Sequence, residues 1–251
     1  MLNEKVTYRR HEIVMEIQGK VLLIIPAYNE QENIEKVADQ LVHDFAQYDY
    51  VIINDGSRDK TEEICEKNGY NLVNLPINLG IGGAVQTGYR YAQKYGYEIA
   101  VQIDGDGQHD IGYVEEVIKP ILEGKTDISV GSRFLRKEGF QSSAARRTGI
   151  RILSSLIAVC TGVKIFDVTS GFRAVNKKFI DIYAEDYPAD YPEPEALITA
   201  VMYGGRVQEV PVIMKERYGG ESSIDFKKSV YYMIKVTLAI LIKRISYGVR
   251  R

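Results

Sequence analysis

The sequence has few cysteines, no long apolar run and no excess of either charge, and each shortage disfavours a class of protein. Its 251 residues include two cysteines, Cys65 and Cys160, which lie far apart. Such spacing fits small hydrophobic side chains in a reducing cytoplasm better than a disulfide framework. The first 20 residues are mixed and charged, without the apolar centre of a secretion signal. Since no run approaches the roughly 18 apolar residues of a membrane span, we do not expect the chain to cross a membrane by itself.

The charge balance argues against a nucleic-acid partner. Lysine and arginine total 32, against 34 aspartate and glutamate residues. The chain also has no zinc-ligand spacing and no RNA-binding signature. Its 45% hydrophobic content is enough for one α/β domain with a full core, or for a domain with an appendage.

Short apolar runs alternate with helical patterns from residue 21 to residue 131. The predicted strands are 21–25, 50–53, 72–75, 99–103 and 128–130. The predicted helices between them are 30–45, 59–67, 83–95 and 113–122. Strands buried on both faces and joined by helices predict a parallel, Rossmann-like sheet with right-handed crossovers. Such sheets bind ligands at the carboxyl ends of their strands.

The alternation of short apolar runs with helical patterns ends after residue 131. The segment 133–151 is basic and poor in strand signal, 150–161 is an apolar helix candidate, and 186–195 contains three of the seven prolines. A strand over 206–214 and a helix over about 225–246 complete the predicted elements. We expect this half to cover the open side of the sheet.

The segment Asp-Gly-Asp-Gly-Gln-His, residues 104–109, directly follows a predicted strand. The carboxylates of Asp104 and Asp106 can bind one divalent cation, and such oxygen ligands with substrate phosphates suit Mg²⁺ or Mn²⁺. A calcium loop would use Gln108 and Glu115 as well, but His109 occupies its glycine position. A simple strand-to-helix turn is the plainer alternative. The carboxylate pair favours a protein that binds a nucleotide diphosphate.

Three other predicted strand ends carry polar or glycine-rich segments. Pro26 is expected to end the first strand, and Tyr28 can then stack on a base or ribose. Asp55 follows the second strand and can accept a hydrogen bond from a ring N–H. The third strand leads to a glycine-rich helix entry at 78–83, which lacks the spacing of a dinucleotide fingerprint. Each segment alone is weak, but their order is informative.

The order Pro-Ala-Tyr-Asn-Glu, Asn-Asp-Gly-Ser, Asn-x-Gly and Asp-x-Asp resembles the family 2 glycosyltransferases of GT-A fold over residues 21–135. Thr-Ser-Gly-Phe-Arg at 169–173 and Arg-Tyr-Gly-Gly-Glu-Ser at 217–222 extend the resemblance to the polyprenyl-phosphate branch. That branch includes dolichyl-phosphate mannose synthases and bacterial undecaprenyl-phosphate sugar transferases. The family often has proline after its motif histidine, where this chain has Asp110.

The resemblance implies a role for particular residues. Those implied to hold the metal and diphosphate are Asp104, Asp106 and Gln108. Those implied to line the nucleotide pocket are Pro26, Tyr28, Glu30, Asp55 and Asp104. Those implied to bind the acceptor phosphate are Arg133, Arg146, Arg147 and Ser170, and those implied to act in catalysis are Asp104, Asp106, Arg133 and Arg217. Plainer readings are a solvated arginine face over 133–151, a loop-orienting His109 and a supporting turn at Ser170.

The implied reaction is inverting transfer of a hexose from a nucleotide-diphosphate sugar to polyprenyl (undecaprenyl) phosphate, for cell-surface glycan synthesis. UDP-glucose or UDP-N-acetylglucosamine is the favoured donor. Because a lipid phosphate is already anionic, alignment and charge stabilisation would suffice for catalysis. One alternative is a saccharide hydroxyl acceptor, with Glu193 or Glu195 as the base. The other is a subunit that binds a nucleotide sugar without turning it over.

The end of the chain has the pattern of a basic amphipathic helix. Apolar residues fall on one stripe, and lysines and arginines flank them. We expect contact with an anionic membrane surface, a small membrane-protein partner or a second copy of the chain. The enzyme would then be peripheral on the inner face of the plasma membrane. The expected division is an N-terminal extension over 1–20, a GT-A catalytic domain over 21–224 and this helix over 225–251. The residues of the apolar stripe are Met233, Ile234, Leu238, Leu241 and Ile245.

Overall fold

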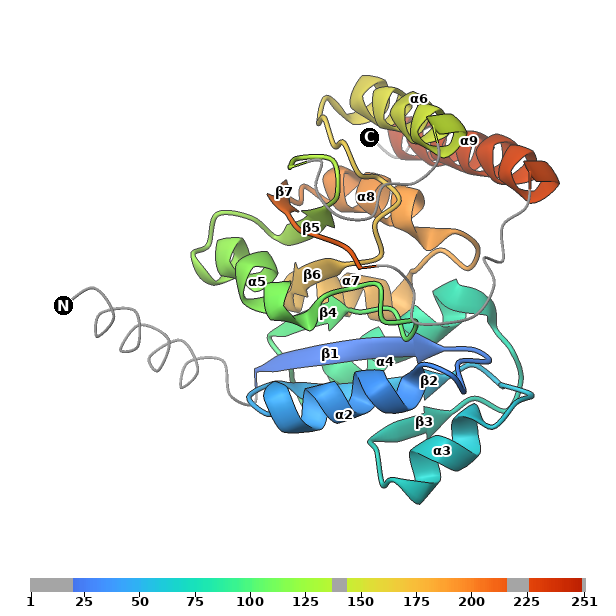
Figure 1. The fold of residues 1–251 in the computed structure, drawn as a ribbon. Coiled ribbons are helices and arrows are strands. Elements are labelled where there is room, and N and C mark those ends of the chain that lie inside the picture. Colours follow the sequence, from blue (N-terminus) through green and yellow to red (C-terminus); the bar gives the residue numbers. More distant parts are fainter. Residues whose placement is uncertain (1–19, 137–143, 216–225, 250–251) are drawn as a thin grey trace.

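One mixed sheet organises the part of the chain that the computed structural model describes, residues 20–136, 144–215 and 226–249. Its seven strands have the order β3-β2-β1-β4-β6-β5-β7 (Figure 1). All pairings are parallel except those of β6, which is antiparallel to β4 and to β5. The strands are β1 (Val21–Ala27), β2 (Asp49–Asn54), β3 (Leu72–Asn74), β4 (Ile99–Gln102), β5 (Ile128–Ser132), β6 (Arg173–Asn176) and β7 (Val207–Pro211).

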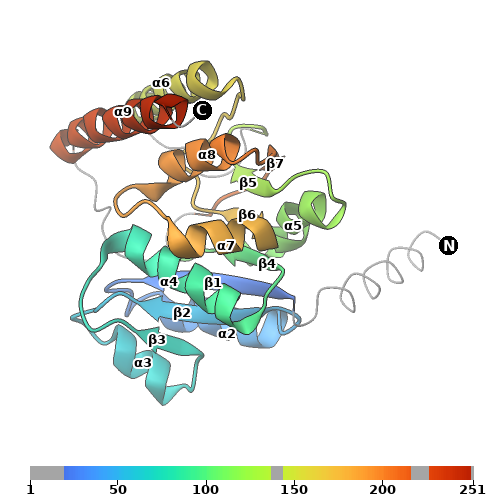
Figure 2. The same ribbon diagram turned by 180° about the vertical axis from the view of Figure 1, so that it is seen from behind.

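Helices cover both faces of this sheet, as the chain direction of its parallel strands requires. On one face lie α2 (Ile34–Asp44), α3 (Thr61–Lys67), and α5 (Val114–Leu122) with the short 3-10 helix Ile111–Tyr113 before it. On the other face lie α4 (Gly80–Tyr95), α6 (Ala144–Thr161), α7 (Lys177–Glu185), α8 (Pro192–Met202) and α9 (Phe226–Val249) (Figure 2).

Strand β1 is fully buried because both of its faces are covered. Leu22 and Ile24 belong to the apolar cluster beneath α4, and Leu23 and Ile25 belong to the cluster beneath α2. This accounts for its unbroken apolar sequence. The predicted α/β class, the mostly parallel sheet and each of the five strands predicted between residues 21 and 131 are confirmed. The division into extension, catalytic domain and terminal helix stays a prediction.

The prediction that Pro26 ends the first strand is wrong. Pairing of β1 with β2 continues through Pro26 opposite Ile53 and Ala27 opposite Asn54. Pairing with β4, in contrast, ends at Ile24 opposite Gln102. Since proline has no N–H to donate, it stops the ladder on the β4 side alone.

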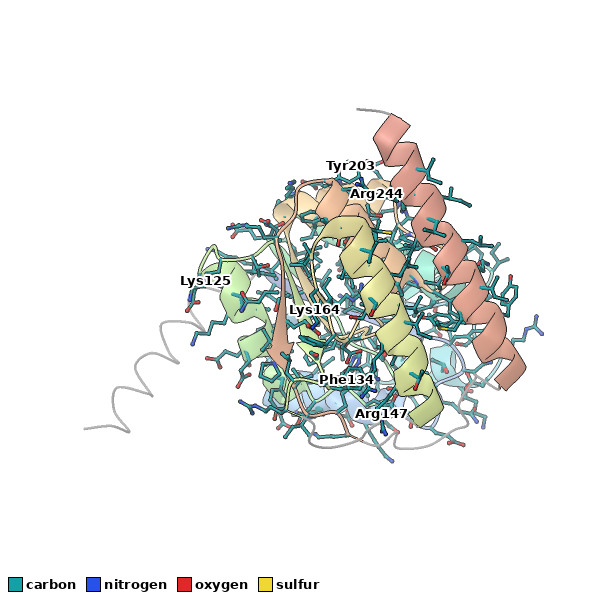
Figure 3. All side chains as sticks on the ribbon, turned by 90° about the horizontal axis from the view of Figure 1, so that it is seen from above. Lys125, Phe134, Arg147, Lys164, Tyr203 and Arg244 are labelled. Atoms are coloured by element: carbon teal, nitrogen blue, oxygen red, sulfur yellow. The ribbon has the colours of Figure 1, made fainter. Side chains whose placement is uncertain are left out.

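Helices α6 and α9 lie side by side outside α8 (Figures 1 and 3). The predicted terminal helix is thus present, and Val236 and Ile240 on one of its faces are buried in the core. No helix within the described ranges is both long and apolar enough to cross a membrane.

Candidate active site

The Asp-Gly-Asp-Gly-Gln-His loop lies at the carboxyl end of β4, where parallel sheets bind ligands. Asp106 is buried, and its Oδ1 accepts a hydrogen bond of 2.9 Å from the backbone N–H of Gln108. Asp104 is more accessible, with 35% of its side chain exposed. The Nε2 of Gln102 donates to Asp104 Oδ1 at 3.3 Å. The two carboxylates therefore differ: Asp106 shapes the turn and Asp104 faces out of it.

Space is available beside the Asp104 carboxylate because Gly171 has no side chain. A Cβ built there would lie 3.0 Å from Asp104 Oδ1 and 2.9 Å from Gln102 Nε2. Within the described residues, no cluster of three or more histidine, cysteine or acidic side chains could enclose a metal ion. The accessible carboxylate of Asp104, with the Asp106 carboxylate and the Gln108 amide in the same loop, offers the oxygen donors of a cation that also binds substrate phosphates. The residues therefore fit Mg²⁺ or Mn²⁺.

Strand β6 brings Gly171 to this position. Because β6 runs against its neighbours, its amino end lies at the same edge as the carboxyl ends of β4 and β5, and Arg173 is opposite both Gln102 and Val130. The Ser170 hydroxyl donates to the Gly131 carbonyl at 2.6 Å and is buried. Ser170 thus binds the Thr-Ser-Gly segment to β5. Its contact with an acceptor phosphate stays a prediction.

The first two loops of the predicted nucleotide pocket are joined by hydrogen bonds. Asn29 has a left-handed backbone, with φ of 56°, and its N–H donates to the Ser57 hydroxyl at 3.0 Å. The N–H of Glu30 donates to Thr61 Oγ1 at 2.8 Å. Tyr28, which precedes these two residues, is 43% exposed. An exposed aromatic ring on a firmly held loop is available to stack on a base.

Asp55 ties the second loop to the third. It is buried, and its Oδ1 accepts a hydrogen bond of 2.7 Å from the N–H of Leu79. Burial raises the pKa of Asp55, while the N–H groups of Leu79 and Gly80 act in the opposite direction. The glycine-rich helix entry is closed by the chain itself, since Gly82 donates its N–H to Ala189 O at 3.1 Å. This helix terminus is therefore covered by protein backbone.

Arg133, at the end of β5, is buried and bound to Asp167 through two side-chain hydrogen bonds of 2.7 Å. Its Nη2 also donates to Thr169 Oγ1 at 3.1 Å. Burial alone would lower the pKa of Arg133, but Asp167, with the charges of Asp104 and Glu193, raises it. The guanidinium is thus a fixed cation within electrostatic range of the Asp-x-Asp loop.

The other predicted arginines are less well placed or lie outside the description. Arg147 is on α6, partly buried, on the side shown in Figure 3. Arg217, with the rest of 216–225, lies outside the described residues, and so does the side chain of Arg146. Their predicted roles stay predictions.

The structure adds a buried arginine whose role the sequence did not indicate. Arg173 donates only to carbonyl oxygens in its described hydrogen bonds, to Ser170 from Nε at 2.6 Å, to Val168 from Nη2 at 3.0 Å and to Glu193 from Nη1 at 2.5 Å. It thereby fixes the start of α8 against the Thr-Ser-Gly segment. In the sequence, Arg173 was indicated only by its position at the end of the Thr-Ser-Gly-Phe-Arg segment.

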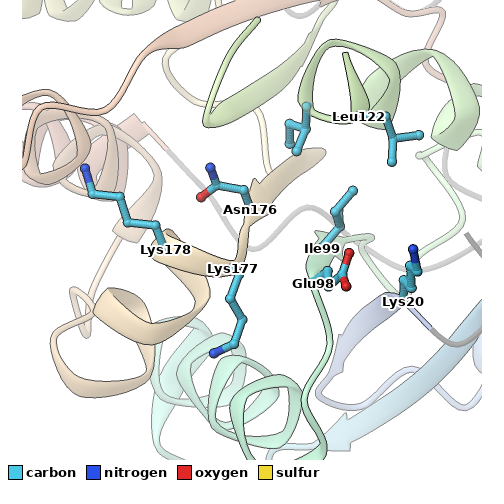
Figure 4. Close-up of a pocket in the computed structure, with 8 residues that line it drawn as sticks. Lys20, Glu98, Ile99, Leu122, Asn176, Lys177 and Lys178 are labelled. Atoms are coloured by element: carbon cyan, nitrogen blue, oxygen red, sulfur yellow. The ribbon is translucent and has the colours of Figure 1, made fainter. Parts of the chain in front are cut away.

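A hollow of about 520 Å³ lies elsewhere, at the amino ends of β1 and β4 (Figure 4). The Asp-x-Asp loop is at the opposite edge of the sheet, so this hollow is not the candidate site. Its lining residues are Lys20, Glu98, Ile99, Ile121, Leu122, Asn176, Lys177 and Lys178.

Comparison with known proteins bears on the same region. The family model described as Glycosyl transferase family 2 matches residues 22–183. The UDP-N-acetylglucosamine--dolichyl-phosphate N-acetylglucosaminyltransferase of Methanococcus voltae is 34% identical over 213 residues, which cover 76% of this chain and 84% of that protein. The polyprenol monophosphomannose synthase of Mycolicibacterium smegmatis is 26% identical over 227 residues, which cover 86% of this chain and 85% of that protein.

A solved structure shares the fold. It is glucosyl-3-phosphoglycerate synthase from Mycobacterium tuberculosis, in complex with Mn²⁺ and UDP-glucose. The superposition has a TM-score of 0.67 at 20% identity and covers 92% of this chain and 82% of that one. At this identity the likeness supports the GT-A-like fold.

Proposed function

Because the chain belongs to glycosyl transferase family 2, we propose that it transfers a hexose from a nucleotide-diphosphate sugar to a polyprenyl phosphate. One structural observation carries the proposal. The Asp104 carboxylate stands beside the space left by Gly171, at the ligand-binding edge of the sheet. Relatives that are named for transfer to dolichyl and polyprenol phosphates support the acceptor class.

In this proposal the chain aligns two anionic substrates. Asp104, Asp106 and Gln108 hold Mg²⁺ or Mn²⁺, which when bound supplies Lewis-acid stabilisation of the leaving diphosphate. The Arg133 guanidinium, whose charge is balanced by Asp167, lies within electrostatic range of Asp104. Arg133, Arg146 and Arg147 are proposed to bind the acceptor phosphate, and Arg217 is proposed to act in catalysis. A phosphate oxygen of the acceptor would bond to the anomeric carbon as the bond to the leaving diphosphate breaks. This single in-line displacement would invert the configuration, and the anionic phosphate would need no protein base.

We propose UDP-glucose or UDP-N-acetylglucosamine as the donor. Tyr28 offers an exposed ring, and Asp55 places a carboxylate between the second and third loops. A carboxylate accepts a hydrogen bond from a ring N–H such as that of uracil. Glu30 and Pro26 complete the proposed pocket, and the Pro26 carbonyl lies beside the backbone of Gly105.

An exposed apolar surface on α6 and α9 suits a membrane-embedded acceptor. On α9, Val236 and Ile240 face the core, whereas Ile234, Leu238 and Ile242 are exposed by 53–61%. The predicted apolar stripe is thus directed outward except at Met233, which lies against Gly149 of α6. The further exposed apolar residues of the two helices are Ile152, Val159, Tyr231, Leu241 and Ile245.

The charge of this surface favours anionic lipid. Neither α6 nor α9 contains an aspartate or glutamate in its sequence. The two helices carry exposed arginines, Arg151 on α6 and Arg244 on α9, and Arg244 is labelled in Figure 3. An apolar helix face flanked by cations binds the interface of an anionic bilayer. We propose that the enzyme is peripheral on the inner face of the plasma membrane through this surface.

Liposome flotation tests the membrane proposal. Leu238→Glu with Ile242→Glu should abolish flotation with anionic vesicles, whereas Val42→Glu, at an exposed apolar position on α2, should not. Flotation of all three proteins alike would contradict binding through α9. Failure of the wild-type chain to float would assign its recruitment to a small membrane protein or a second copy.

A transfer assay tests the reaction itself. The purified full chain should convert UDP-glucose or UDP-N-acetylglucosamine, with polyprenyl phosphate in detergent and Mn²⁺ or Mg²⁺, into an organic-extractable sugar lipid that mild acid hydrolyses. Transfer to soluble saccharides instead would support the hydroxyl-acceptor alternative, for which Glu195 is partly buried and has a raised pKa. Donor binding without transfer would support a non-catalytic subunit.

A further inference from the structure

Both ring nitrogens of His109 face the same residue, Asp104. The Nδ1 of His109 accepts a hydrogen bond of 3.0 Å from the backbone N–H of Asp104. The Nε2 lies 3.5 Å from Asp104 Oδ2. The other carboxylate oxygen, Oδ1, receives the Gln102 amide. Each oxygen of the Asp104 carboxylate thus has a nitrogen neighbour supplied by the protein.

The imidazole is held in this orientation by packing. It stacks on Phe172, with ring centroids 5.1 Å apart and ring planes inclined by 19°. His109 also forms a backbone bridge with Met214, and the N–H of Lys215 donates to Gln108 O at 2.9 Å. Only 3% of the histidine side chain is exposed. A ring so enclosed cannot turn toward a substrate without disturbing this packing.

The backbone contact determines which nitrogen carries hydrogen. A peptide N–H is always a donor, so the Nδ1 that it approaches must be an acceptor. The neutral ring then carries its hydrogen on Nε2, the atom beside Asp104 Oδ2. His109 therefore accepts a hydrogen bond from the Asp104 backbone and brings its Nε2–H within 3.5 Å of the Asp104 carboxylate.

We propose that His109 is the positioning residue for Asp104, setting its carboxylate in the orientation that binds the divalent cation. This inference rests on the metal site of the proposed function. It adds His109 as a residue that acts on the metal through the ligand Asp104. Partners of metal ligands typically change metal affinity by about 10–100-fold when they are removed. Among the described residues, Gln102 gives the carboxylate its one side-chain hydrogen bond, so loss of the histidine should loosen its rotamer.

Two substitutions separate the two nitrogens. In His109→Asn, the amide oxygen can replace Nδ1 and keep the loop contact, but nothing replaces Nε2. In His109→Gln, the terminal amide can reach the position of Nε2 and donate to Oδ2. His43→Asn, at an exposed position on α2, is the matched control.

The primary measurement is Mn²⁺ affinity of nucleotide-free protein by electron paramagnetic resonance. We expect about 10–100-fold weaker binding for His109→Asn, recovery of most of that loss in His109→Gln, and wild-type affinity for His43→Asn. Wild-type Mn²⁺ affinity in His109→Asn would overturn the positioning role of His109 but would leave the proposed metal site standing. Absence of Mn²⁺ binding by the wild-type chain would overturn the metal site of the proposed function, and the assignment with it.

A second measurement uses only the wild-type protein and so does not depend on variant folding. The ¹⁵N spectrum of the imidazoles should show a His109 ring protonated on Nε2 and unprotonated on Nδ1. The opposite tautomer, with hydrogen on Nδ1, would overturn the proposed arrangement.

Discussion

The carboxylate of Asp167 holds the guanidinium of Arg133 in a buried, two-point pair, with Nε to Oδ2 and Nη2 to Oδ1 both at 2.7 Å. Asp167 is fully buried and also accepts the backbone N–H of Arg133 at 3.1 Å. Its own N–H donates to Glu209 on β7 at 2.8 Å. The end of β5 is therefore fastened to the segment that leads into β6, and so to the site.

Removing one partner of this pair should be costly. Asp167→Ala leaves a buried guanidinium without its carboxylate, and we expect the free energy of unfolding in urea to fall by about 3–5 kcal/mol. Lys177→Ala, which breaks the exposed Lys177–Asp181 pair on α7, should cost about 0.3–0.5 kcal/mol. Equal losses in the two variants would show that the Arg133 pair contributes no more than a surface contact.

Gly171→Ala should damage the site without unfolding the protein. The added methyl group meets the Asp104 carboxylate and the Gln102 amide at about 3 Å, so one of them must shift. A displaced ligand can lower kcat/KM by up to about 100-fold. Gly112→Ala is the control, since its Cβ has only an ordinary contact with Asp110 at 3.4 Å. Steady-state kinetics that do not distinguish the two variants would mean that the space beside Asp104 is not used.

Glu195→Gln should stabilise the protein at neutral pH. Burial raises the pKa of Glu195, with Lys243 and Lys235 on α9 opposing the shift. A raised folded-state pKa means that stability is lost as pH rises through it. The Tm advantage of the glutamine variant should therefore be present at pH 7 and shrink toward pH 4 in calorimetry. If transfer activity also vanishes in this variant, Glu195 acts as a base and the hydroxyl-acceptor alternative gains support.

The two cysteines should differ in reactivity. Burial raises the pKa of Cys65 to about 11, so about one thiol in a thousand is ionised at pH 8. Cys160 on α6 is only partly buried. Iodoacetamide under native conditions should modify Cys160 alone, as read by peptide mass spectrometry, and both after unfolding. Native modification of Cys65 would contradict its place in the core.

The sequence predicted those strands whose apolar pattern matches their burial in the sheet. The apolar runs of β1, β2 and β4 predict strands because these strands are covered on both faces, and the chemical motifs follow at strand ends. Strand β6 could not be found in this way, because Arg173 and Asn176 at its ends interrupt the apolar pattern of a four-residue strand. Its antiparallel direction, which brings Gly171 to Asp104, depends on contacts distant in sequence.

The same limit applies to the site. The Asp104 and Asp106 pair could be found from spacing, whereas Asp167 has no local signal and its pairing with Arg133 is a tertiary contact. The glycine-rich entry of α4 was ambiguous for a similar reason, since the carbonyl of Ala189, more than 100 residues later, covers Gly82.

The decisive measurement compares sugar transfer to polyprenyl phosphate by Asp106→Asn and Asp110→Asn. Asp106 is buried in the proposed metal loop, whereas Asp110 caps the following turn and pairs with Lys215 at 3.2 Å. With saturating Mn²⁺ and donor, Asp106→Asn should remain folded and lose transfer by roughly 100-fold or more. Asp110→Asn should stay near the wild-type rate. Equal transfer by both variants and the wild-type chain would contradict the proposed active site.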